Sequence, residues 1–181
     1  MNYYYIPQNA WGLVDADGAQ NVGFYSALGG PCSPVAIWCE ATSRAAYTHF
    51  DGNQHAVSAA LADWLSDDSA HHELNVLGFH EPHLDAIKAQ LEAVLEGAHV
   101  ATLPEQEQFW GFRIDANTPV WVDERELPPE DLVEIPDSWH GYWDGAPEWV
   151  NGGTFTNAIA DQLTGFIANY NGRFYFDFDA Q

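Results

Sequence analysis

Two residues in the first third of the chain are candidates for nucleophilic chemistry. Cys32 follows a glycine-rich turn in the stretch "SALGGPCSPVAIWCEATSRAAYTHF", residues 26–50, and His49 stands near the end of the same stretch. A cysteine attacks a carbonyl carbon as its thiolate, so it needs a nearby base, cation or helix terminus that lowers the pKa of the thiol. His49 is the candidate base. A purely structural interpretation stays open, because cysteine is often buried as a small apolar residue.

The spacing of Cys32 and His49 predicts that a β-hairpin brings them together. Two strand candidates, 34–41 and 44–50, flank a turn near Thr42. Residues at equal distances from a hairpin turn face each other, and the midpoint between Cys32 and His49 falls between Glu40 and Ala41. We therefore expect the two side chains to lie opposite each other. Backbone N–H groups of the glycine turn before Cys32 could hold an oxyanion.

The elements that must position this pair follow from the hydrophobic pattern and the turn residues. The clearest pattern is a helix that begins at Pro82 and stops at Gly97, with one apolar stripe facing the core. The pattern predicts one domain over residues 1–181, of α/β (α+β) class, built as a layered sandwich of a largely antiparallel mixed sheet with about three helices. Strands are expected at 3–6, 22–28, 34–41, 44–50, 74–79, 99–103, 108–114, 119–124 and 173–179, further helices at 54–65 and 156–170, and a loop over 127–153.

The run from Ser26 to His49 resembles the motif of the cysteine glutamine deamidases. That superfamily includes the chemoreceptor glutamine deamidases, the catalytic domain of cytotoxic necrotizing factor and Burkholderia lethal factor. Ser26 stands where chemoreceptor deamidases have Thr, the residues "LGG" resemble their glycine turn, and His49 falls at their Cys-to-His interval. Pro31, directly before the nucleophile position, departs from the family pattern. The resemblance covers roughly residues 22–103.

This resemblance implies hydrolysis of a protein glutamine side chain to glutamate, through a thioester on Cys32 and without a cofactor. His49 would take the thiol proton, and Ser26 would orient His49. The glycine turn and the start of the next strand, Gly29, Gly30 and Ser33, would supply the oxyanion site. A bacterial effector or toxin is the kind of protein that the resemblance favours. A transglutaminase or another cysteine hydrolase would share the nucleophile and differ in the acceptor.

The charge of the chain bears on its partners. Asp and Glu number 27 against five Lys and Arg, for a formal net charge of −22. Nucleic acids and anionic membranes are disfavoured as partners, because their binding needs basic side chains. A target protein with a basic surface is favoured. The same feature fits a rival class, a non-enzymatic acidic binding or inhibitor protein of the immunity type.

An aromatic tract near the C-terminal end is the candidate surface for recognising a protein target. It reads "DSWHGYWDGAPEW", residues 137–149, and aromatic side chains concentrate binding energy at interfaces. A loop that covers the core with its own side chains is an equally good interpretation. The residues concerned are Trp139, Tyr142, Trp143 and Trp149.

A second cluster, "FHEPH", offers His80, Glu81 and His83 for a metal site, with His71 or His72 as a third histidine. Histidines three residues apart are common at helix starts, so we favour the structural interpretation and expect no metal. Residues 1–18 have neither a basic nor an apolar segment of a signal peptide, so we expect a cytoplasmic protein, or one exported without a cleaved signal. Cys32 and Cys39 would point to opposite faces of one strand, which argues against a disulfide.

Overall fold

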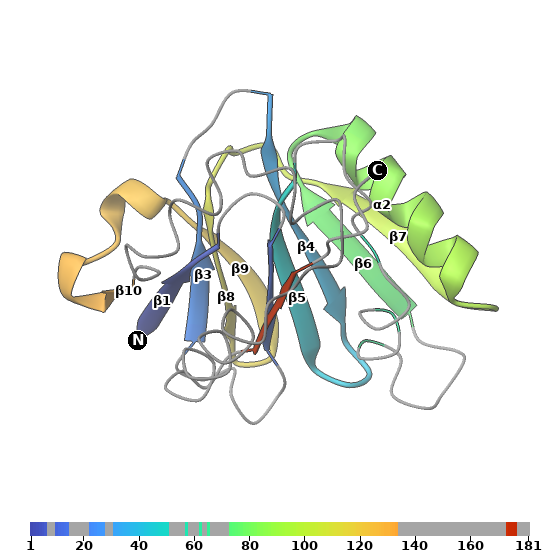
Figure 1. Cartoon of the computed structure of the whole chain (residues 1–181), viewed down its shortest axis with the longest axis horizontal. Coiled ribbons are helices and arrows are strands. Elements are labelled where there is room, and N and C mark those ends of the chain that lie inside the picture. Colours follow the sequence, from blue (N-terminus) through green and yellow to red (C-terminus); the bar gives the residue numbers. More distant parts are fainter. Residues whose placement is uncertain are drawn as a thin grey trace, which may run out of the picture.

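A computed structural model of the chain describes residues 1–6, 10–14, 22–27, 31–50, 57, 62, 65, 73–133 and 173–176. These residues form an α+β fold with two mixed β-sheets and one α-helix (Figure 1). The sheet-dominated α+β class expected from the sequence is confirmed. The expected single sheet is wrong, since the strands divide into two sheets. The expected number of about three helices is not matched, since the described residues contain one α-helix. Most of the expected helix 54–65 and all of the expected helix 156–170 lie outside the described residues.

The first sheet has five strands. Its β1 pairs in parallel with β10 on one side and with β3 on the other, and β8 runs antiparallel to both β3 and β9. Two short 3₁₀ turns, Glu124–Glu126 and Pro129–Asp131, connect β9 to β10. In sheet order the strands are β10 (Leu132–Val133), β1 (Asn2–Tyr5), β3 (Val22–Tyr25), β8 (Gly111–Asp115) and β9 (Thr118–Val122).

The second sheet has six strands and carries the hairpin that contains His49. All its neighbours run antiparallel except β6 and β7, which are parallel. A parallel pair needs a crossover, and helix α2 (Glu81–Val94) supplies it. In sheet order the strands are β11 (Arg173–Phe176), β2 (Ala10–Val14), β5 (Arg44–Phe50), β4 (Ser33–Cys39), β6 (Glu73–Gly78) and β7 (His99–Pro104).

The six-stranded sheet is covered on both faces, as the alternation of side chains along β5 shows. The ring of Tyr47 stacks on Phe24 and Phe112 of the five-stranded sheet, with ring centroids 5.9 and 6.0 Å apart. The neighbouring Ala46 and Phe50 belong instead to the apolar cluster on the α2 side. Strands buried on both faces are nearly continuous apolar runs, and β4 and β5 are buried along almost their whole length.

Helix α2 forms where the pattern predicts it. Pro82 occupies the first turn, and the helix ends at Val94, before Gly97. Gly97 has φ of 82°, a left-handed conformation that glycine adopts without steric cost. The buried stripe packs on β4, β6 and β7, and burying each such side chain contributes about 1.5–3 kcal/mol. This stripe consists of Leu84, Ile87 and Leu91, all fully buried.

Within the described residues, no helix is long and apolar enough to cross a bilayer.

Candidate active site

Strands β4 and β5 form the expected antiparallel hairpin, but its register differs from the expectation. Pro34, not Cys32, pairs with His49. The pairing of Cys39 with Arg44 leaves residues 40–43 in the turn, and Ser43 lies in the left-handed region with φ of 54°. This turn lies further along the chain than the midpoint between Cys32 and His49. The prediction that these two residues stand directly opposite each other is therefore wrong.

The observed register still places Cys32 and His49 on one face of the six-stranded sheet. Directly opposed residues of antiparallel strands project to the same face, so Pro34 and His49 share a face. Side chains alternate between the two faces along β4. If this alternation continues to Cys32, the residue before the strand begins, Cys32 projects to the same face as Pro34 and His49. The two residues are then diagonal neighbours, with Cα atoms roughly 7–8 Å apart in typical sheets, which long and aromatic side chains can span.

Cys32 and His49 differ in exposure. Cys32 is half-buried and lies just outside the strand, whereas Cys39 on the same strand is fully buried. Neither Cys32 nor Cys39 is joined in a disulfide in the described part of the chain. His49 is 7% exposed, and its ring meets the Trp110 ring edge-on, with centroids 4.9 Å apart. A partly accessible thiol on the same sheet face as a sheltered imidazole suits a nucleophile and a base.

Ser26 is hydrogen-bonded to Trp110, the residue whose ring meets His49. Its hydroxyl donates to the Ile6 carbonyl at 2.6 Å, and its backbone N–H donates to the Trp110 carbonyl at 3.0 Å. The same Trp110 carbonyl accepts a hydrogen bond from the Tyr47 hydroxyl at 2.8 Å. Burial raises the pKa of the Tyr47 phenol far above its ordinary value, so this donor stays neutral. Ser26 and Tyr47 together hold the residue whose ring contacts His49.

Ser33, one of the expected oxyanion residues, has a buried hydroxyl with a definite partner. Its Oγ is hydrogen-bonded to Nδ1 of His83 at 2.5 Å. The sequence pattern places His83 in an exposed first helical turn, but in the structure this residue is only 8% exposed. The signal that could have identified it is its spacing, since His83, Ile87 and Leu91 follow one another at intervals of one helical turn.

The remaining predicted residues divide into two groups. Gly29, Gly30, His71, His72 and the four aromatic residues of 139–149 lie outside the described residues. His80 and Glu81 are exposed at the start of α2. In the part of the chain that the structure describes, no three His, Cys, Asp or Glu side chains come together in a way that could hold a metal ion.

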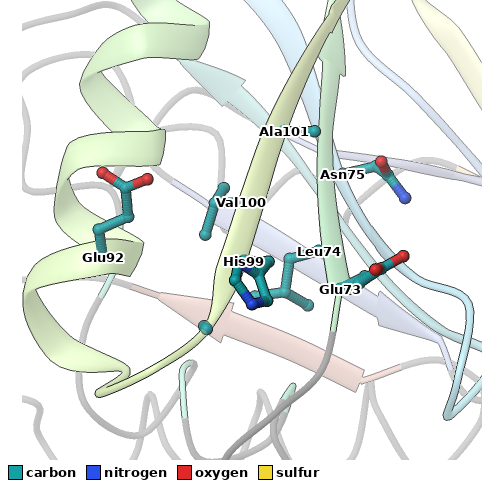
Figure 2. A pocket seen from close by; sticks show the side chains of 8 residues that line it. Glu73, Leu74, Asn75, Glu92, His99, Val100 and Ala101 are labelled. Atoms are coloured by element: carbon teal, nitrogen blue, oxygen red, sulfur yellow. The ribbon is translucent and has the colours of Figure 1, made fainter.

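A pocket of about 490 Å³ opens between α2 and the start of β6 and β7 (Figure 2). Glu73 of β6, Glu92 of α2 and His99 of β7 contribute polar groups to its lining. Strand β6 runs from this pocket to Gly78, which pairs with Val35 near the Cys32 end of β4. The pocket therefore lies at the opposite end of the sheet from Cys32 and does not belong to the candidate active site.

Comparison with protein-family models gives no match for this chain, and comparison with curated proteins gives no similar one.

Proposed function

We propose that the protein is a cysteine-dependent glutamine deamidase that acts on a protein with a basic surface. The observation that carries the proposal is the half-buried Cys32 directly before β4, which the alternation of that strand places diagonally across from His49 on β5. Thiol activation requires the base within hydrogen-bond reach of the thiol, and placement on one face of two paired strands supports that arrangement. The resemblance of residues 22–103 to the cysteine glutamine deamidases gives this pair its reaction.

The reaction would proceed by acyl transfer in two halves. His49 takes the thiol proton of Cys32, and the thiolate attacks the carboxamide carbon of a glutamine side chain. The C–N bond then breaks, and ammonia leaves with the proton that His49 held. Water, deprotonated by His49, hydrolyses the thioester to glutamate and restores the thiol. Backbone N–H groups of Cys32 and Ser33 are the candidates for holding the oxyanion, since Pro31 has none.

The charge of the molecule supports a basic target. The formal net charge of −22 repels nucleic acids and attracts cationic surfaces. A single carboxamide offers little contact area, so selectivity for one glutamine of a folded protein must come from the surrounding surface.

The proposal is tested by incubating the full chain with a panel of basic, glutamine-containing proteins. Released ammonia and the conversion of glutamine to glutamate in peptide mass spectra are measured together. We expect both with the wild type and with Cys39→Ala, and neither with Cys32→Ala. Binding without conversion would support the acidic binding protein instead. Incorporation of an added primary amine in place of hydrolysis would indicate a transglutaminase.

A further inference from the structure

We propose that Ser33 and His83 act as a positioning pair that directs Cys32 toward His49. The inference rests on the proposed function, because it concerns the same nucleophile. The hydrogen bond between Ser33 Oγ and His83 Nδ1 joins the first residue of β4 to the first turn of α2. Ser33 is fully buried and His83 nearly so. Their side chains therefore act on the substrate only through the neighbouring Cys32.

The direction of the Ser33 side chain explains how this bond affects Cys32. Consecutive residues of a strand project to opposite faces, so Ser33 points to the α2 side while Cys32 points to the His49 side. Phe50, the cross-strand partner of Ser33, meets the His83 ring edge-on, with ring centroids 5.0 Å apart. The side chains of Ser33, Phe50 and His83 therefore lie together on the α2 side. Fixing Ser33 on that side fixes the rotation of the strand about its own axis. The thiol is then turned toward His49.

The start of β4 is where such an anchor is needed. In the described residues, the ladder pairs of β4 with β5 begin at Ser33, and those with β6 begin at Val35. Cys32 precedes both ladders in the chain. The hydrogen bond of the Ser33 side chain is therefore the anchor adjacent to Cys32. His83 is itself held, because its backbone N–H donates to the His80 carbonyl at 2.9 Å.

Packing alone does not account for this polar pair. The Ser33 side of the pair borders the buried apolar cluster that includes Phe50 and Leu84, while the exposed His80 ring lies 4.1 Å from the His83 ring, centroid to centroid. Burying a hydroxyl and an imidazole there costs free energy that their mutual hydrogen bond offsets, whereas two apolar side chains would fill the space without that cost. A directional bond adds defined geometry, which is what a nucleophile beyond the end of a strand requires.

The experiment compares Ser33→Ala and His83→Leu with His83→Asn in the full chain. Two readouts are used: the rate at which iodoacetamide alkylates Cys32, and kcat and KM for ammonia release. A nucleophile displaced by about 1 Å loses on the order of 10–100-fold in rate. We expect losses of that size in alkylation and kcat for Ser33→Ala and His83→Leu, with KM unchanged. The double variant should lose no more than either single variant, since the two residues act as one unit.

His83→Asn is the variant that separates positioning from bulk packing. The side-chain amide of Asn can replace Nδ1 as the partner of the Ser33 hydroxyl, so we expect most of the reactivity to return. Asp85→Asn, an exposed change on the same helix, serves as the matched control and should behave as the wild type. Thermal melting identifies any variant that does not fold. If His83→Leu does not fold, the positioning role is tested by comparing Ser33→Ala, which should lose reactivity, with His83→Asn, which should keep most of it.

Failure of this inference is distinguishable from failure of the proposed function. If wild-type Cys32 reacts no faster than the same cysteine in a synthetic peptide of residues 29–36, the proposed function is wrong. If wild-type Cys32 is reactive and depends on His49, but Ser33→Ala and His83→Leu match the wild type, only the positioning role is wrong. Equal losses in His83→Asn and His83→Leu, both folded, would also overturn it.

Discussion

At the scale of single residues, the site combines a reachable thiol with a sheltered histidine. His49 is held against Trp110, and Trp110 is held in turn through its carbonyl by Ser26 and Tyr47. A base whose ring is fixed by packing is preorganised for proton transfer, which is how positioned side chains accelerate such steps. In the proposed function, the residues that surround His49 therefore belong to the same unit as the thiol.

Removing either member of the pair should abolish activity without unfolding the protein. Cys32→Ala deletes the attacking sulfur atom, and His49→Gln deletes the base while keeping a polar side chain of similar reach. We expect ammonia release to fall by at least about 10³-fold in each, with melting temperatures near that of the wild type. Full activity in Cys32→Ala would place the nucleophile elsewhere in the chain.

Tyr47 gives a prediction for stability. Tyr47→Phe removes the hydrogen bond to the Trp110 carbonyl and should cost about 1 kcal/mol of unfolding free energy at neutral pH. Burial raises the pKa of the folded phenol above the ordinary 10.0, so the unfolded chain loses this proton first as pH rises. The stabilising contribution is therefore complete below pH 10 and is lost above it, by up to about 1.4 kcal/mol per pH unit.

Urea unfolding of wild type and Tyr47→Phe at several pH values between neutral and strongly alkaline checks this. The wild type should lose stability more steeply above pH 10, because Phe cannot ionise. The difference between the two proteins should thus shrink as pH rises. Parallel curves across the whole range would show that Tyr47 does not differ in ionisation between the folded and unfolded states.

At the scale of elements, β4, β6 and α2 approach one another closely beside the site. A Cβ atom on Gly78 would lie 2.9 Å from the Pro34 carbonyl oxygen and 3.0 Å from a Leu84 methyl group. Pro34 is opposite His49 and two residues from Cys32. The absence of a side chain at Gly78 therefore allows β6 and α2 to pack closely against the start of β4.

Gly78→Ala should push β4 away from β6 and so displace Cys32 and Pro34 at the start of β4. Overpacking of this kind costs about 1–3 kcal/mol, and we expect a lower melting temperature together with slower alkylation of Cys32. The control is Ala89→Ser, which also adds one heavy atom but on the exposed side of α2. It should leave alkylation unchanged and cost at most about 0.5 kcal/mol in helix propensity. Wild-type alkylation and stability in Gly78→Ala would mean that the end of β4 tolerates displacement.

The sequence predicts the local elements better than their assembly. Helix α2 and the β4–β5 hairpin are evident from local patterns, since an apolar stripe and a turn are encoded in neighbouring residues. Strand β2 is not among the expected strands. Gly12 interrupts its pattern, and a Cβ atom there would meet Phe24 at 2.6 Å, a contact formed only on folding. The short β10 falls inside the expected 127–153 loop.

The same distinction applies to the site. Cys32 and His49 are recognisable because their residue types and spacing are local features. The hairpin register is not, because it depends on how many residues the turn between Cys39 and Arg44 holds. The bond between Ser33 and His83 joins residues fifty positions apart, and only the folded arrangement of β4 against α2 reveals it.

At the scale of the whole molecule, the acidic field should control encounter with the target. With a net charge of −22, association with a basic protein should slow as added salt shortens the screening length, which is about 10 Å at 0.1 M. We expect kcat/KM for a basic protein substrate to fall between low salt and about 0.5 M, by roughly tenfold or more.

A short, uncharged glutamine peptide provides the control for this effect. Its hydrolysis should be nearly independent of salt, because no charged surface steers it to the site. Equal salt dependence for peptide and protein would indicate an effect on the enzyme itself. Salt-independent rates for both would mean that the acidic surface does not select the substrate.

The most direct test of the central claim is the reactivity of the Cys32 thiol, which can be measured without knowing the target. Iodoacetamide labelling, followed by peptide mapping, gives the alkylation rate of Cys32 at neutral pH in the wild type, in His49→Gln and in a peptide of residues 29–36. Cys39 is buried, so it reports unfolding rather than activation. We predict that wild-type Cys32 reacts faster than the peptide and that His49→Gln removes the advantage. Alkylation of wild-type Cys32 at or below the peptide rate, unchanged in His49→Gln, would contradict its activation by His49.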